Sequence, residues 1–207
     1  MTPDLKLGLI GNHIARSRSP FLHRLAGEQN AMIVQYDRLI PNAMGAYFDT
    51  VFDRCVGRGY RGINVTYPYK ELAAQKVTIV DPLVQAIGAV NTVLFEADGP
   101  VGHNTDYSGF IEAYRGARGD KLPGISCLIG TGGVGRALAF GLVTLGASEI
   151  RLVDRDPDPA KAEALAADLR AAGAVVRVFD RAEDASRGAS GLLNGTPVGM
   201  IGYGGTP

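Results

Sequence analysis

Three polar side chains in one short stretch of the chain could act together on a small molecule. An apolar segment, residues 62–65, leads into a turn, and the stretch carries an amide, a hydroxyl and an ammonium group at Asn64, Thr66 and Lys70. These groups suit a polyhydroxylated, anionic ligand, and a lysine can also transfer a proton. The alternative is structural, with Thr66 as the N-cap of a helix that Pro68 opens and Lys70 solvated in its first turn. A cation in the first turn opposes the helix dipole, so this alternative leaves Lys70 slightly misplaced.

Asp106 is the carboxylate that could share a proton with Lys70. It precedes an apolar-periodic helix pattern that includes Phe110, Ile111 and Tyr114, so it could equally be the N-cap of that helix. A lysine–aspartate pair in a cleft can shuttle one proton when burial brings the lysine pKa toward the working pH. Because an adjacent carboxylate opposes that fall in pKa, the sequence leaves the balance open.

Ser17 and Ser19 form a pair of hydroxyls just ahead of another predicted helix. Ser19 is a natural N-cap and Pro20 a natural first residue of that helix, so capping alone would explain the pair. Two hydroxyls beside a helix N-terminus can also bind a carboxylate, which the helix dipole favours. The pair therefore predicts either a cap or a carboxylate site.

A glycine-rich turn follows a buried strand in the second half of the chain. Residues 130–135 read Gly-Thr-Gly-Gly-Val-Gly and match the pattern G-x-G-x-x-G. They lie between an apolar segment, residues 125–129, and a helix pattern over residues 136–145, and the next strand ends at Asp154. The glycines alone are a weak signal, but the strand–turn–helix context and the acid predict a dinucleotide site. In such a site the glycines permit a tight turn, approach of the backbone to the pyrophosphate and close packing of helix on strand.

Two neighbouring residues bear on which dinucleotide binds. Asp154 would accept a hydrogen bond from the adenosine ribose 2′-hydroxyl and would repel a 2′-phosphate, which favours NAD over NADP. Arg155 weakens that inference, because an arginine there can hold a 2′-phosphate. The cofactor is therefore NAD or NADP, with NAD favoured by Asp154.

Alternating strands and helices must position the polar residues of the first half. The predicted strands are residues 5–10, 33–38 and 62–65. The first predicted helix runs over 20–30, with an apolar stripe of Phe21, Leu22 and Leu25. Further helices are predicted to start from a cap at Asn42, to start at Pro68, and to run over 82–88. A hairpin is predicted from residues 89–95 and 101–106, with Asn91 at one open end and Asp106 at the other. This order predicts a parallel or mixed sheet with helices on its faces, and such sheets bind ligands at the C-terminal ends of their strands.

The second half repeats the alternation around the glycine turn. After the strand over 150–153 come an alanine-rich helix over 159–172, a strand over 175–179 and a strand over 190–193. A doubly wound nucleotide domain normally has more strands than these. The chain then stops in a glycine-rich loop, so we expect a truncated piece of a longer protein.

Composition limits the class of protein and its partners. The 207 residues are 46% apolar and 20% charged with a formal net charge of zero, which gives no support for a nucleic-acid or membrane partner. Cys55 and Cys127 lie in apolar segments and are interpreted as reduced core cysteines of a cytoplasmic protein. No Cys/His cluster is present, so no metal site is predicted.

Five motifs in order resemble those of the shikimate dehydrogenase family, including its quinate/shikimate branch. The motifs are Gly8-Leu9-Ile10-Gly11 with Ser17-x-Ser19-Pro20-x-x-His23; Asn64-Val65-Thr66-x-Pro68-Tyr69-Lys70; Gly88-Ala89-Val90-Asn91-Thr92; Gly102-x-Asn104-Thr105-Asp106-x-x-Gly109-Phe110; and Gly130-x-Gly132-Gly133-x-Gly135-Arg136-Ala137. The late segment Asn194-Gly195-Thr196-Pro197-Val198-Gly199-Met200 resembles the family's loop beside the nicotinamide.

The resemblance implies a role for each candidate residue. Ser17 and Ser19 would bind the substrate carboxylate, and Lys70 would be the acid/base, paired with Asp106. The ring hydroxyls would be held by Asn64, Thr66, Asn91 and Asp106. The cofactor would be held by Gly130, Gly132, Gly133, Val134, Gly135, Asp154, Arg155, Asn194, Thr196, Pro197, Gly199 and Met200.

The resemblance also implies a fold and a reaction. We expect a two-domain α/β protein, with a mixed-sheet substrate domain over residues 1–106 and a truncated Rossmann-like dinucleotide-binding domain over residues 107–207. An active-site cleft would lie between them. The reaction would be reversible oxidation of shikimate to 3-dehydroshikimate, with hydride passing to NAD or NADP.

Two departures from the family pattern keep alternatives open. Members that prefer NADP usually carry Asn-Arg-Thr where this chain has Asp154-Arg155-Asp156. The tripeptide of this chain resembles the NAD-using quinate/shikimate branch. Ser19, in contrast, resembles the shikimate-preferring members. The second departure is the missing C-terminal part. The alternatives are an NAD-dependent quinate/shikimate dehydrogenase of catabolism and a dinucleotide-binding regulator without turnover. The expected partner is a small-molecule substrate, and the expected state is a monomer or homodimer.

Overall fold

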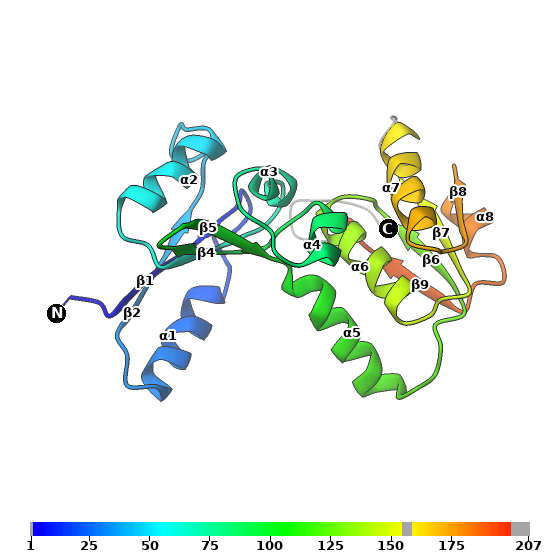
Figure 1. Cartoon of the computed structure of the whole chain (residues 1–207), viewed down its shortest axis with the longest axis horizontal. Helices are drawn as coiled ribbons and strands as arrows, with labels where there is room; N and C mark the ends of the chain where they lie inside the picture. Colours follow the sequence, from blue (N-terminus) through cyan, green and yellow to red (C-terminus); the bar gives the residue numbers. More distant parts are fainter. Residues whose placement is uncertain (1, 155–158, 200–207) are drawn as a thin grey trace. The chain divides into compact units, whose positions relative to one another are not determined.

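The computed structural model describes residues 2–154 and 159–199 of the chain. The chain divides into two compact units, Met1–Asn104 and Thr105–Pro207, and each unit has its own sheet. Strands and helices alternate in both units (Figure 1). The chain is thus a two-domain α/β protein, as predicted.

The first unit is built on a mixed sheet. Its elements are β1 (Leu5–Ile10), α1 (Ser19–Gln29), β2 (Val34–Leu39), α2 (Phe48–Gly57), β3 (Gly62–Val65), α3 (Lys70–Ala74), α4 (Pro82–Ile87), β4 (Thr92–Glu96) and β5 (Gly99–His103). Within residues 2–104 the strand order is β2-β1-β3-β4-β5. β1 is parallel to β2 and β3, whereas β4 is antiparallel to β3 and β5. The mixed sheet and the hairpin, now β4–β5, are therefore confirmed.

Both faces of this sheet are covered, because neighbouring residues of a strand point to opposite sides. Ile10 packs in the larger core cluster with Phe52 of α2. The preceding residue, Leu9, packs with Ile14 and Tyr36 in a separate cluster. α1 and α2 lie on opposite sides of the sheet (Figure 1).

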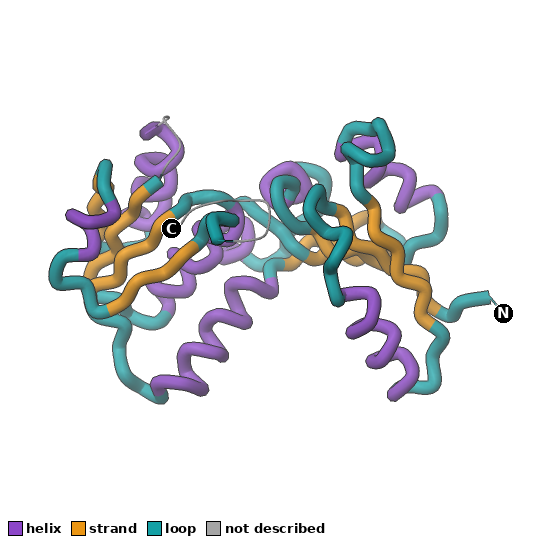
Figure 2. The backbone as a smooth tube through the Cα atoms, turned by 180° about the vertical axis from the view of Figure 1, so that it is seen from behind, coloured by secondary structure: helices purple, strands orange, loops and turns teal. Residues whose placement is uncertain are grey.

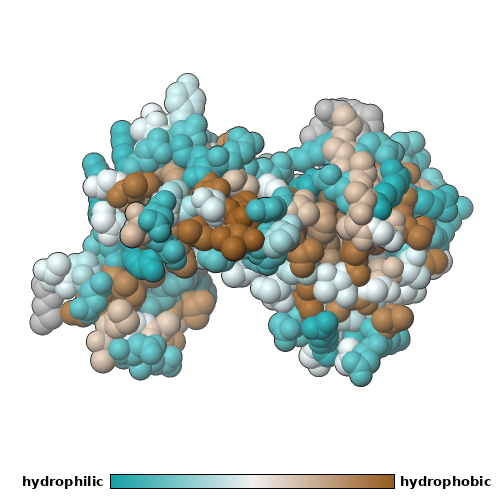
Figure 3. All heavy atoms as spheres, viewed as in Figure 1, coloured by the Kyte–Doolittle hydropathy of each residue, from teal (hydrophilic) through white to brown (hydrophobic). Residues whose placement is uncertain are grey.

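The apolar stripe predicted for α1 is wrong. Phe21 and Leu22 are 66% and 62% exposed, and the buried residues of the helix are Pro20 and Gly27. A Cβ at Gly27 would lie 2.4 Å from a methyl of Val34, so α1 packs on β2 through a glycine instead of large side chains. Exposed apolar side chains are interspersed with hydrophilic ones on the face shown in Figure 3.

The helix predicted from a cap at Asn42 begins later. Residues 41–45 form turns, and α2 starts at Phe48 after an extended Tyr47. Gly45 has φ +59°, a left-handed conformation that interrupts a right-handed helix. The turn chemistry around this glycine therefore outweighs the apolar pattern before Phe48.

The helix predicted from Pro68 is also displaced. The Tyr67–Pro68 peptide is cis, and the N–H of Tyr69 donates to the carbonyl of Thr66 at 3.0 Å to close a turn. α3 then begins at Lys70, with Tyr69 as its N-cap residue. Thr66 is therefore not a helix cap.

The second unit carries a parallel sheet. Its elements are α5 (Thr105–Arg118), β6 (Ile125–Ile129), α6 (Gly133–Thr144), β7 (Glu149–Val153), α7 (Pro159–Ala171), β8 (Val176–Phe179), α8 (Ala182–Ser186) and β9 (Gly191–Asn194). Among its described residues the order is β8-β7-β6-β9, all parallel, with helices flanking the strands (Figure 2). The chain order of the strands reverses between β6 and β9, which is the point where Rossmann-like sheets bind dinucleotides. The predicted Rossmann-like fold is confirmed.

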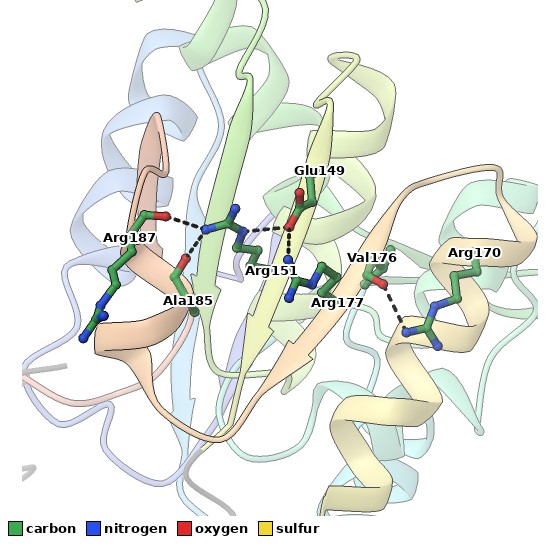
Figure 4. Close-up of polar contacts among 7 residues, drawn as sticks. All are labelled: Glu149, Arg151, Arg170, Val176, Arg177, Ala185 and Arg187. Atoms are coloured by element: carbon green, nitrogen blue, oxygen red, sulfur yellow. Dashed lines mark hydrogen bonds and ion pairs between the residues drawn. The ribbon is translucent and has the colours of Figure 1, made fainter.

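One arginine ties α8 to this sheet. Arg151 of β7 is 11% exposed, and its guanidinium donates to the carboxylate of Glu149 at 2.7 Å. It also donates to the carbonyls of Ala185 at 3.0 Å and Arg187 at 2.7 Å (Figure 4). These bonds fix the end of α8 and the start of the segment that leads into β9.

Candidate active site

The first unit brings the ends of β1 and β3 together. The N–H of Thr66 donates to the carbonyl of Ile10 at 2.9 Å, and the N–H of Asn12 donates to the carbonyl of Tyr67 at 3.3 Å. A Cβ at Gly11 would lie 2.3 Å from the methyl of Thr66, so only a glycine lets the two loops touch in this way. The loop that carries Ser17 and the turn that carries Thr66 therefore leave the same edge of the sheet.

Ser17 and Ser19 form a hydrogen-bonded pair at the start of α1. The hydroxyl of Ser17 donates to the hydroxyl oxygen of Ser19 at 3.0 Å and accepts the N–H of Ser19 at 3.2 Å. The N-cap residue is Arg18, whose side chain makes no cap bond, so the prediction of Ser19 as N-cap is wrong. Arg38 of β2, which the sequence did not single out, donates to the carbonyl of Ser17 at 2.6 Å. Both serines are half-buried and stay candidates for a carboxylate site.

Asn64 and Asn91 are joined through Thr92, and Asn64 also accepts a bond from Tyr36; neither Thr92 nor Tyr36 was predicted as a site residue. The phenol of Tyr36 donates to Oδ1 of Asn64 at 2.8 Å. Nδ2 of Asn64 donates to Oγ1 of Thr92 at 3.2 Å, and Thr92 donates to Oδ1 of Asn91 at 3.1 Å. Thr92 lies in one of the five family motifs. Tyr36 lies in none of them, and only the alternation of side chains along β2 could have placed it on this face.

Lys70 is buried at the first position of α3. The residue is 8% exposed, so the alternative of a solvated lysine is wrong. The carbonyl of Lys70 accepts the N–H of Val90 at 3.0 Å, which joins the start of α3 to the segment that carries Asn91. A lysine is almost never buried to this extent for packing alone.

Asp106 is the second residue of α5, in the second unit. The helix begins at Thr105, so Asp106 lies in its first turn and is not its N-cap. A carboxylate in the first turn is favoured by the helix dipole. Lys70 belongs to the first unit, and the pairing of these two groups stays a prediction.

The glycine turn has the geometry of a phosphate-binding loop. Gly130 has φ +93°, which makes the tight turn out of β6, and Gly132 is the N-cap residue of α6. A Cβ at Gly135 would lie 2.0 Å from the carbonyl oxygen of Gly130. α6 can therefore pack this closely against the end of β6 only because residue 135 is a glycine. A Cβ at Gly132 would meet no atom within 4 Å, which leaves the backbone open to a ligand at the helix N-terminus. Gly133 and Val134 form the first turn of α6.

Asp154 is held against this turn. The backbone N–H of Thr131 donates to Oδ2 of Asp154 at 2.8 Å, and the Thr131 hydroxyl bonds the same oxygen. Thr131 is 1% exposed and was not singled out from the sequence. The carboxylate therefore has a fixed place beside the phosphate-binding loop. Arg155, the other predicted cofactor residue here, lies outside the described residues.

The loop after β9 packs on the glycine turn because β9 is parallel to β6. A Cβ at Gly195 would lie 2.9 Å from Cα of Gly135, and a Cβ at Gly130 would lie 2.5 Å from the methyl of Thr196. Oδ1 of Asn194 accepts the N–H of Thr196 at 2.9 Å and its hydroxyl at 2.7 Å. Pro197 and Gly199 continue this loop, and Met200 lies outside the described residues. The predicted cofactor residues Asn194 and Thr196 thus lie beside the predicted phosphate site.

Other kinds of site are not formed by the described part of the chain. Within residues 2–154 and 159–199, no group of three or more His, Cys, Asp or Glu side chains could hold a metal ion, and no helix is long and apolar enough to cross a membrane. Both cysteines are free and buried, and burial raises the pKa of the Cys55 thiol to about 12. Burial also raises the pKa of Cys127. Neither thiol is therefore an activated nucleophile.

Two family models match the chain, one in each unit. The model described as the shikimate dehydrogenase substrate binding domain matches residues 9–93. The model described as NADP oxidoreductase, coenzyme F420-dependent, matches residues 126–192.

Named relatives extend over nearly the whole chain. The quinate/shikimate dehydrogenase (NAD(+)) of Corynebacterium efficiens is 36% identical over 211 residues, which cover 98% of this chain and 74% of the relative. A quinate dehydrogenase structure from Corynebacterium glutamicum, in complex with NAD, has a TM-score of 0.83 and 35% identity, covering 98% of this chain and 74% of that one. A shikimate 5-dehydrogenase structure from Thermus thermophilus, in complex with NADP(H) and shikimate, has a TM-score of 0.77 and 34% identity, covering 95% and 70%.

Proposed function

The chain belongs to the shikimate dehydrogenase family, and on this basis we propose that it catalyses reversible, NAD(P)-dependent oxidation of shikimate to 3-dehydroshikimate. The observation that carries the proposal is the burial of Lys70 directly after the strand and turn that hold Asn64 and Thr66. A buried ammonium is costly to maintain, and such groups cluster at functional sites.

The first unit supplies the residues that bind the substrate in this proposal. The Ser17–Ser19 pair binds the carboxylate, and Asn64, Thr66 and Asn91 bind ring hydroxyls. Their support is the adjacency of β1, β3 and β4 in one sheet, which gathers these side chains from separate parts of the chain. Fixing the carboxylate at one end determines which ring carbon is presented for reaction.

Lys70 is the proposed acid/base, with Asp106 as its paired carboxylate. In the reducing direction Lys70 delivers a proton to the carbonyl oxygen as negative charge develops there, and in the oxidising direction it takes the proton from the hydroxyl. Asp106 also binds a ring hydroxyl in this proposal.

The second unit holds the dinucleotide. When bound, the nicotinamide accepts or supplies the hydride. Gly130, Gly132 and Gly135 form the turn that faces the pyrophosphate, and Asp154 accepts a hydrogen bond from the ribose. The fixed carboxylate of Asp154 supports NAD over NADP, in line with the NAD named for the Corynebacterium relatives.

A division into a substrate domain over residues 1–106 and a cofactor domain over residues 107–207 is part of the proposal. We also propose a cytoplasmic location, because two buried free thiols suit a reducing compartment. A monomer or homodimer is expected, and light scattering on the purified protein measures it.

Initial rates on the full-length protein test the function, with shikimate and quinate each crossed with NAD and NADP. A kcat/KM that favours NAD, with both acids oxidised, supports the quinate/shikimate alternative that Asp154 favours. A preference for NADP with shikimate alone supports an NADP-dependent shikimate dehydrogenase.

The non-enzymatic alternative predicts a different result in the same experiment. A dinucleotide-binding regulator binds NAD in calorimetry but oxidises neither acid. That outcome would reject the proposed function while leaving the role of the glycine turn intact.

A further inference from the structure

Tyr36 lies among the proposed substrate residues without being one of the residues predicted from the sequence. It is on β2, 3% exposed, and packs with Leu9 and Ile14 on the face of the sheet that α1 covers. The ring centroid of His23, from α1, lies 4.5 Å from that of Tyr36. The ring is therefore held in one place by its surroundings.

The hydroxyl of this buried ring holds one of the proposed substrate residues. It donates to Oδ1 of Asn64 at 2.8 Å. A phenol has one O–H, so the bond to Asn64 uses the only proton of Tyr36. Burial raises the pKa of Tyr36 to about 12, so the phenol keeps its proton at neutral pH.

The bonds form one directed chain across the first unit. Tyr36, Asn64 and Thr92 each donate to the next residue, and the chain ends at Asn91. Because Tyr36 donates to Oδ1, the amide of Asn64 is turned so that its NH₂ group faces Thr92. The two asparagines that are proposed to bind ring hydroxyls are thus oriented from one buried hydroxyl.

We propose that Tyr36 is a positioning residue, which sets the orientation of the Asn64 amide and so fixes how the substrate's ring hydroxyls are bound. This inference rests on the proposed function. Without the phenol hydroxyl, the amide of Asn64 can rotate and exchange its oxygen and nitrogen. Ground-state and transition-state binding then weaken together, which raises KM more than it lowers kcat.

The same sheet offers a matched control at Tyr60. Tyr60 is 9% exposed, and its phenol donates to Oδ2 of Asp37 at 2.7 Å. It packs in the cluster on the other face of the sheet, with Ile10 and Phe52. Tyr60→Phe therefore removes one buried phenol hydrogen bond without touching any proposed substrate residue.

Steady-state kinetics on the full-length protein compare Tyr36→Phe with Tyr60→Phe. For Tyr36→Phe we expect KM for shikimate to rise about tenfold, from the lost hydrogen bond and the freed Asn64 amide, with kcat within about threefold and KM for NAD unchanged. Tyr60→Phe should keep both KM values within about twofold of wild type. Thr92→Val, which breaks the next bond of the chain, should also raise KM for shikimate and supplies the test if Tyr36→Phe does not fold.

Two results overturn the positioning role while the proposed function stands. One is a wild-type KM for shikimate in Tyr36→Phe, or in Thr92→Val if Tyr36→Phe does not fold. The other is an equal loss in the Tyr36 and Tyr60 variants, or a loss that extends to KM for NAD, which would indicate general damage to the fold. A wild-type protein that oxidises neither acid with either dinucleotide would instead reject the proposed function and this inference with it.

Discussion

At the scale of single residues, burial distinguishes groups that the sequence pattern left ambiguous. Lys70 had a solvated interpretation and Ser19 a capping interpretation, and the structure contradicts both. Pattern alone could not decide, because the same residue types start helices and bind anions. The deciding observations are the 8% exposure of Lys70, which follows from tertiary packing, and the start of α1 at Ser19 with Arg18 as its N-cap residue.

Replacing Lys70 tests its role directly. Lys70→Ala should lower kcat by about 10²–10⁴, the usual contribution of a positioned acid/base group. Lys76 is a matched control, because it follows α3 closely and forms ion pairs with Asp53 at 2.9 Å and Asp49 at 3.5 Å. Lys76→Ala should leave kcat within about twofold of wild type. Stopped-flow or steady-state rates with NAD and shikimate measure both, and a near-wild-type kcat for Lys70→Ala would remove it from the mechanism.

At the scale of elements, two glycines at the start of α6 are expected to differ in role, Gly135 in packing and Gly132 in cofactor binding. Gly135→Ala places a Cβ against the carbonyl of Gly130 and should lower the free energy of unfolding by about 1–3 kcal/mol. Gly132 has φ −71° and ψ −173°, which alanine adopts freely, and its Cβ would point into open space. Gly132→Ala should therefore keep wild-type stability yet raise KM for NAD about tenfold, by blocking the pyrophosphate. Urea unfolding and NAD titrations separate the two effects, and equal behaviour of the two variants would contradict this division.

Arg151 makes a second prediction about elements. Its three hydrogen bonds run to Glu149 in the same strand and to two carbonyls at the end of α8, and the Arg151 and Glu149 side chains are 11% and 18% exposed. Arg151→Ala should lower the free energy of unfolding by about 2–3 kcal/mol, since it removes three hydrogen bonds of a charged group, one of them to a partly buried carboxylate. Arg177 is 62% exposed and 3.9 Å from the same carboxylate, so Arg177→Ala should cost less than about 0.5 kcal/mol. Thermal unfolding that ranks the two variants the other way would be inconsistent with the network in Figure 4.

Elements with a contiguous pattern were predicted well, whereas helix starts set by turn geometry and residues that act through distant contacts were not. The strands around the glycine turn carry short apolar runs, and the turn itself is a contiguous pattern, so both were found. The starts of α2 and α3 were misplaced because Gly45 and the bond from Tyr69 to Thr66 decide them. Tyr36 and Thr131 were missed because each acts through a residue far away in sequence.

At the scale of the whole molecule, the chain forms two units, each with its own sheet, and the proposal assigns the substrate to the first and the dinucleotide to the second. Hydrogen exchange read by mass spectrometry should resolve this division. NAD should slow exchange in residues 130–135 and 194–199, because ligand binding to the native state suppresses local opening. Shikimate should slow exchange in residues 17–20 and 64–70. Protection by NAD confined to residues 2–104 would contradict the assignment of the two units.

The contact among Gly130, Gly135 and Gly195 restricts which substitutions these three positions can accept during evolution. An alanine at Gly135 or Gly195 would strike backbone of another glycine, and no smaller residue exists to relieve the clash from the other side. No second substitution can therefore compensate for an alanine at Gly135 or Gly195. Under the proposed function, a change in cofactor preference would instead come through side chains beside these glycines, and the hydrogen-bonded pair Thr131–Asp154 is where such divergence would begin.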